Sequence, residues 1–88
     1  MNQSILFPDI QNWDENLERV SFPAQQAGAL IECYISMEQL EKLSAQEVKS
    51  PQQALDVFNQ YRFDIEEIVE EKIEQEEWTS SGSIDVLL

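Results

Sequence analysis

The sequence predicts one α+β domain, residues 1–88, in which a small antiparallel sheet carries a short and a long helix on one face. Three observations predict this fold class. Short segments near both ends of the chain alternate between apolar and polar residues, as half-buried strands do. Between them, two helix-start signals precede apolar residues at helical spacing. The 88 residues suffice for one modest core without disulfides or metals. We therefore expect the order strand, strand, strand, helix, helix, strand.

The first predicted strand covers residues 4–9, in which Ile5 and Phe7 share a face. Residues 9–16 are mostly polar and predict a connection rather than a strand. That connection carries one large aromatic side chain, Trp13, which could either pack on the core or serve as an exposed contact.

A hairpin is expected after this connection. Residues 18–24 and 29–35 both alternate, and Gly28 in the turn between them can adopt a positive φ. The apolar face of the second strand consists of Ile31, Cys33 and Ile35.

Cys33 is the only cysteine, so no internal disulfide can form. It lies in an apolar, strand-like run, where free cysteine is usually buried. A catalytic thiolate would need a histidine or clustered cations nearby, and the chain has no histidine. We expect an inert core thiol.

Two capping boxes mark where the helices begin. Ser36 is followed three residues later by Gln39, and Ser50 is followed by Gln53. The first helix is short, whereas the helical period of the second continues to about Glu77. Its apolar stripe is formed by Ala54, Leu55, Phe58, Tyr61, Ile65, Ile68, Val69 and Ile73.

The length of the second helix conflicts with the size of the domain. A helix over residues 50–77 would span about 42 Å, whereas a compact domain of this length is about 30 Å across. The helix must therefore kink, overhang, or pack on a second copy of the chain. The last strand is expected over residues 83–88, with Ile84, Val86 and Leu88 on one face.

The chain is strongly and unevenly acidic. Its formal charge is −13, and residues 64–77 hold eight acids and one lysine, or −7. Such a charge repels phosphate, so neither nucleic-acid binding nor docking on an anionic membrane is expected. No apolar run approaches the roughly 18 residues of a spanning helix. The first residues also lack the basic-then-apolar pattern of a signal peptide. We expect a cytoplasmic protein.

Three roles are open for this acidic segment: a solvated helix face, a set of metal ligands, or a dock for a basic partner. A metal is not expected, because a helix surface presents carboxylates from one side only. Most charge runs on amphipathic helices face water. However, the acids of the last turn oppose the helix dipole, and stability gives no reason for them. The docking hypothesis therefore stays open.

One face of this helix is the candidate interaction surface. Phe63 falls among the acids on the helical wheel, and it could instead turn inward if the helix kinks near Tyr61. An aromatic side chain ringed by acids resembles the make-up of an interface hot spot. The candidate residues are Phe63, Glu67, Glu70, Glu71, Glu74 and Trp78.

The sequence contains no catalytic or cofactor-binding constellation. It has no histidine and no Gly-rich phosphate loop. Glutamates on a solvated helix also lack the environment that separates the two pKa values of an acid–base pair. We therefore expect no catalytic residue, no cofactor and no metal.

Several segments are distinctive when taken together: "ILFPD", "WDE", "VSFPA", "CYISMEQLEKLS" and "FNQYRFDIEEI". They resemble a family of short bacterial proteins catalogued only as a domain of unknown function. The best markers are Phe58, Arg62 and Ile65, preceded by the strand-to-helix step at residues 36–40. The resemblance covers nearly the whole chain and implies a small α+β fold and a cytoplasmic bacterial origin. It implies no catalytic residues.

These observations favour a non-enzymatic interaction or accessory protein with an acidic helix face. Its expected partners are a second copy of the chain, giving a homodimer, and a basic protein. The alternative is a small enzyme or ligand-binding domain with a site between helix and sheet. A closed pocket with convergent polar groups would favour that alternative, and a filled core would favour the first.

Overall fold

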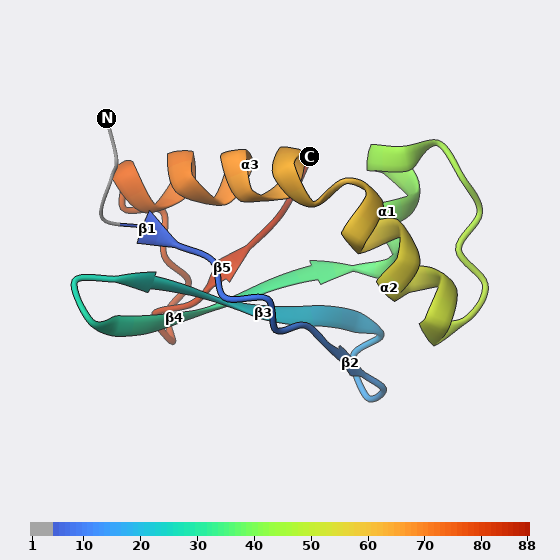
Figure 1. Cartoon of the computed structure of the whole chain (residues 1–88), viewed down its shortest axis with the longest axis horizontal. Helices are drawn as coiled ribbons and strands as arrows, with labels where there is room; N and C mark the ends of the chain where they lie inside the picture. The colour runs from blue at the N-terminus through green and yellow to red at the C-terminus, as the bar shows by residue number, and fades with distance from the viewer. Residues whose placement is uncertain (1–4) are drawn as a thin grey trace.

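The computed structural model describes residues 5–88 and confirms the α+β class (Figure 1). Residue 4, the first residue of the expected strand over 4–9, lies outside the described residues. In chain order the elements are β1 (Ile5–Leu6), β2 (Asn12–Asp14), β3 (Arg19–Gln26), β4 (Ala29–Ser36), α1 (Met37–Ser44), α2 (Pro51–Gln60), α3 (Arg62–Glu74) and β5 (Ile84–Asp85).

The sheet has five strands and is mostly antiparallel. Its main order is β1-β3-β4-β5, and β2 also pairs with β3. Because β4 pairs with β3 along its whole length, β1 and β2 share the other edge of β3. The pair β4–β5 is parallel, which the antiparallel prediction did not anticipate. The chain enters β5 after crossing back along α3, so it runs in the same direction as β4.

The segment 9–16 was predicted as a connection, and this was wrong for its central part. Asn12–Asp14 form β2, and Trp13 lies opposite Val20 of β3. Trp13 is half-buried and packs against the core, although its Nε1 has no hydrogen-bond partner among the described residues. A three-residue strand is too short to show alternation in the sequence, so only its pairing with β3 reveals it.

The β3–β4 hairpin confirms the predicted turn. Ala27 and Gly28 connect the strands, with φ values of 52° and 84°. Two consecutive positive φ values are typical of the two-residue turns that match strand twist. This turn sets the register, in which Phe22 lies opposite Cys33.

Both predicted N-caps are present, but the reciprocal half of each capping box is not seen: the Gln39 Oε1 accepts from the Leu88 N–H and the Gln53 Oε1 accepts from the Lys49 N–H. The Ser36 hydroxyl accepts a hydrogen bond from the Gln39 backbone N–H at 3.1 Å, and Ser50 accepts one from Gln53 at 3.1 Å. Each cap satisfies a donor that the first helical turn leaves free.

The predicted long helix is divided in two, which resolves the conflict between its length and the domain size. Tyr61 leaves the helical region, with ψ at 22°, so α2 ends at Gln60 and α3 begins at Arg62. Figure 1 shows α3 lying along the sheet and α2 turned away from it beside α1. α3 ends at Glu74, earlier than the predicted Glu77. The resulting molecule measures 35 × 24 × 22 Å.

One apolar core lies between the three helices and one face of the sheet. The predicted strand faces and most of the helical stripe contribute to it. Val48, in the segment between α1 and α2, is buried although no periodicity predicted it, whereas Leu88 is 53% exposed and leaves the predicted face of the last strand. The buried apolar residues are Ile5, Val20, Phe22, Ala24, Ile31, Cys33, Ile35, Leu40, Val48, Ala54, Val57, Phe58, Ile65, Val69, Ile73, Ile84 and Val86.

Candidate functional site

The outward side of α3 is fixed by the residues on its inward side. Ile65, Val69 and Ile73 are buried at every turn of the helix, so the residues on the opposite side face solvent. Phe63 is 84% exposed. The prediction that a kink would turn Phe63 inward is therefore wrong, although the helix does break at Tyr61. Phe63 lies about 200° around the helix from Ile65, and the burial of Ile65 directs Phe63 outward.

The acids next to Phe63 form an uncompensated stripe. Glu67, Glu71 and Glu74 are exposed and Glu70 is half-buried. Among residues 5–88, the ion pairs along this segment use the neighbouring acids instead, Glu66 and Glu77. We call Glu67, Glu70, Glu71 and Glu74 the acidic stripe. These four carboxylates lie on one helix, and none forms an ion pair with a Lys or Arg among residues 5–88.

Trp78 is separated from Phe63 by the length of α3. Phe63 is the second residue of the helix, whereas Trp78 follows its end and is 41% exposed. Thirteen helical residues span about 20 Å. The structure therefore brings Phe63 together with the acidic stripe and leaves Trp78 at the far end, in the segment that returns to β5.

Arg62 positions the start of α3, a role that the sequence did not reveal. Its Nη1 donates to Gln11 Oε1 at 2.7 Å, its Nη2 donates to the Pro8 carbonyl at 2.8 Å, and its Nε donates to Glu66 at 2.9 Å. These contacts join α3 to the segment between β1 and β2. Charge-assisted bonds of this kind are among the stronger ones in proteins, so they orient the acidic stripe and Phe63.

A second feature lies on the face of the sheet opposite the core, and sequence analysis missed it. A shallow hollow of about 240 Å³ is walled by Leu17, Arg19, Tyr34, Ser36, Asp85 and Leu87, among others. The signal in the sequence is the outward half of the alternation in β3 and β4. Which outward residues meet there depends on register and on β5, and neither can be deduced from alternation.

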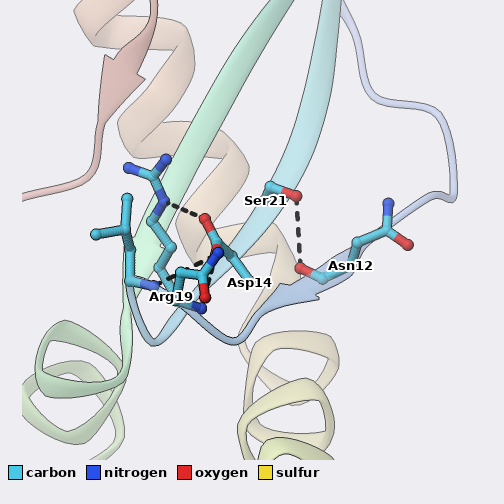
Figure 2. Close-up of polar contacts among 6 residues, drawn as sticks. Asn12, Asp14, Arg19 and Ser21 are labelled. Carbon is cyan, nitrogen blue, oxygen red and sulfur yellow. Dashed lines mark hydrogen bonds and ion pairs between the residues drawn. The ribbon is translucent and has the colours of Figure 1, made fainter.

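Arg19 is held in place on one side of this hollow. Its guanidinium lies 3.5 Å from the centroid of the Tyr34 ring. Its Nε donates to Asp14 at 3.1 Å, as Figure 2 shows. Asp14 also accepts from the backbone N–H groups of Asn16 and Leu17. Desolvation raises the pKa of Asp14, but the hydrogen bonds and the charge of Arg19 outweigh it and lower that pKa below its usual value.

The described residues offer no metal cluster. Among residues 5–88, no three His, Cys, Asp or Glu side chains converge on a point that could hold a metal ion. Burial raises the pKa of the Cys33 thiol to about 12, which keeps the thiol protonated and unreactive near neutral pH. No helix within this part of the chain is long and apolar enough to cross a membrane.

A family model described as a protein of unknown function, DUF1488, matches residues 5–86. The chain belongs to the DUF1488 family. This confirms the family resemblance found in the sequence. The match spans every strand and helix of the fold, so the whole α+β domain is the family unit.

Three relatives of this DUF1488 protein illustrate the family. "Uncharacterized protein YrdB" of Escherichia coli strain K12 is 40% identical over 82 residues, covering 93% of this chain and 94% of the relative. The protein of the same name from Shigella flexneri is 39% identical, with the same coverage. A crystal structure of a DUF1488 protein of unknown function from Shewanella loihica PV-4 is 48% identical. It superimposes with a TM-score of 0.92 over 98% of this chain and 94% of the other.

Proposed function

We propose that this DUF1488 protein is a non-enzymatic, cytoplasmic interaction protein that docks a basic partner on the outward side of α3. One observation carries the proposal: Phe63 is 84% exposed at the start of a helix face whose four carboxylates, the acidic stripe, form no ion pair with a Lys or Arg among residues 5–88. Aromatic anchors that fill a pocket on the partner, surrounded by weaker contacts, are common at interface hot spots. The acidic stripe would attract a basic surface, and Phe63 would enter an apolar pocket on that surface.

The filled space between the helices and the sheet supports this proposal over the alternative of an internal ligand site. The inward residues of α3 and of β4 are buried against one another, with exposures of 0 to 9%. A ligand site of the usual kind needs a concave space with convergent polar groups. The inward side chains of α3 and β4 that fill this space are apolar: Ile65, Val69, Ile73, Ile31, Cys33 and Ile35.

The test compares two variants of equal charge. The stripe variant changes Glu67, Glu70, Glu71 and Glu74 to Gln. The control changes Glu15, Glu38 and Glu47 to Gln and Asp56 to Asn, all of which are exposed and lie outside α3. Each variant loses four negative charges, from −13 to −9, so any difference between them reports the position of the charge.

The measurement is affinity capture from the native bacterial cytoplasm at low and at high salt. The unmodified protein and the control should retain the same basic protein at low salt and release it at high salt, because screened charges carry the contact. The stripe variant should lose that protein while gaining up to about 1–2 kcal/mol in unfolding free energy, since repulsive pairs disappear. Equal capture by both variants would leave the stripe with no role beyond solubility.

A further inference from the structure

The outer face of the sheet, opposite the core, is open to solvent. All three helices pack on the inner face, and no described helix covers the outer one. The register places Leu6, Gln25 and Leu30 side by side across three strands of the outer face. Leu6 and Leu30 are 60% and 66% exposed. Exposed apolar side chains grouped on one face mark contact surfaces more often than scattered ones do.

The hollow lies toward the other end of the same face and is also bordered by exposed leucines. Leu17 and Leu87, two of its walls, are 60% and 64% exposed. The same hollow is lined by a cation and a carboxylate, Arg19 and Asp85. Apolar and charged contacts are thus available within one small area.

Both charged groups of the hollow retain capacity for an ion pair. Arg19 uses only its Nε toward Asp14, and within the described chain neither terminal guanidinium nitrogen has a protein partner. Figure 2 shows these two nitrogens directed away from Asp14. Asp85 is exposed and takes part in no ion pair with another described residue. The hollow therefore offers one donor and one acceptor that can be met from outside.

We propose that two copies of the chain associate through the outer faces of their sheets, hollow against hollow. A two-fold axis brings each residue of a patch against the complementary residue of the other copy. Arg19 of each copy then pairs with Asp85 of the other, and both ion pairs form at once. Leu17 and Leu87, which border the hollow, pack around these ion pairs.

Charge distribution favours a second copy as the occupant. The hollow carries one positive and one negative side chain, Arg19 and Asp85, so it is complementary to a second copy of itself. A strongly basic partner would instead be repelled by the guanidinium of Arg19. The acidic stripes lie on α3, across the sheet from the patch. In the dimer both sheets separate the two stripes, well beyond the screening length of about 8 Å at physiological ionic strength. The outer face is thus where two such acidic chains can approach.

The experiment is sedimentation equilibrium of the full chain from micromolar to millimolar concentration. We expect a monomer–dimer equilibrium that tightens as salt rises, because screening weakens the long-range repulsion between two chains of charge −13 more than it weakens two ion pairs enclosed in the contact. Docking of a basic partner on α3 has the opposite salt dependence, so the two proposals fail separately. A monomer mass at every concentration and salt level would overturn the dimer.

Two matched variants locate the interface. Asp85→Arg and Glu71→Arg each replace an exposed carboxylate and change the net charge equally. Asp85→Arg faces Arg19 of the second copy with a like charge and should weaken association about tenfold or more. Glu71→Arg lies outside the interface and should leave association unchanged or slightly tighter. Equal effects of the two variants would overturn the proposed face, and thermal melts verify that both are folded.

A mixing experiment tests the pairing of Arg19 with Asp85 itself. In Arg19→Glu alone, two carboxylates meet at each contact, and in Asp85→Arg alone, two guanidinium groups meet. An equimolar mixture restores one opposite-charge pair at each contact and should form a heterodimer. If the mixture associates no better than either variant, the pairing is wrong. If Arg19→Glu fails to fold, the comparison of Asp85→Arg with Glu71→Arg decides alone.

Discussion

The two faces of β4 carry side chains from the same eight-residue strand, and they differ in almost every physical property. Ile31, Cys33 and Ile35 are at most 9% exposed and pack beneath the helices. Leu30, on the other face, is 66% exposed, and Tyr34 there lies under the Arg19 guanidinium. Packing of the core accounts for the apolar residues on the covered face. The open face contributes little burial, and its exposed leucines and charges form the surface on which we propose that a second copy docks.

The same contrast divides α3. Its inward residues join the core, whereas its outward side holds Phe63 and the acidic stripe. Repulsion along the stripe amounts to about 2 kcal/mol at most, and burial of each inward aliphatic side chain contributes roughly 1.5–3 kcal/mol. Packing therefore forms the helix despite its acidic side.

The largest difference in unfolding free energy is expected between substitutions at two neighbouring residues of β4, Ile31 and Leu30. Ile31→Ala, and likewise Ile65→Ala on α3, should lower the unfolding free energy by about 2–5 kcal/mol through lost burial and the cavity left behind. Leu30→Ala should change it by no more than about 0.5 kcal/mol in dilute protein. Urea unfolding followed by tryptophan fluorescence measures all three. If Leu30→Ala cost as much as Ile31→Ala, the open face would belong to the core.

The next largest difference in unfolding free energy is expected between a hydrogen-bonded arginine, Arg62, and an exposed lysine, Lys49. Arg62→Met should cost about 2–3 kcal/mol, because it leaves the Pro8 carbonyl and Gln11 without their charged donor. Lys49→Met is the matched control, since the Lys49 side chain is 74% exposed in its pair with Glu47. It should cost at most about 0.5 kcal/mol. A similar cost for both would mean that Arg62 does not hold α3 in place.

Because Cys33 is buried on the covered face of β4, its thiol should make the unfolding free energy depend on pH. Its thiol has a pKa of about 12 in the folded protein, against an ordinary value of 9.0. Above pH 9 the unfolded chain therefore releases a proton that the folded chain keeps, so stability falls as pH rises. The unfolding free energy should fall by up to ~1.4 kcal/mol per pH unit toward pH 12. Cys33→Ala should lack this part of the slope.

The same thiol gives a kinetic check. A thiol reagent should label the native protein slowly and the urea-unfolded protein fast, because burial blocks access of the reagent to the thiol and keeps the thiol protonated. Rapid labelling under native conditions would contradict the position of Cys33 between β4 and the helices.

The smallest effect belongs to Phe63. Phe63→Ser should change the unfolding free energy by no more than about 0.5 kcal/mol, because a side chain that is 84% exposed contributes little to packing. It should nevertheless weaken capture of the basic partner as the stripe variant does. A loss of stability comparable with that of Ile65→Ala would show that Phe63 packs inward.

Local signals in the sequence predict the helix caps, the hairpin turn and the strand faces. The caps at Ser36 and Ser50 satisfy backbone donors within one turn, and Gly28 allows a turn that spans two residues, so nearby sequence determines each of them. Strand faces follow from alternation, which is why the burial of Cys33 could be predicted. Helical spacing likewise predicts that the acidic stripe lies on one side of the helix.

What only the tertiary structure decided involves residues far apart in the chain. The break at Tyr61 has no proline or glycine to announce it; it lets α2 and α3 both lie on one core, with Arg62 joined to Pro8 and Gln11. The parallel pairing of β5 and the meeting of Arg19 with Asp85 at one hollow depend on the register between strands that are distant in the chain. By itself the sequence determined the class, the caps and the inward and outward faces, because those follow from period and local hydrogen bonding. The angle between helices and the residues that share the outer surface are decided by how the packed layers fit together.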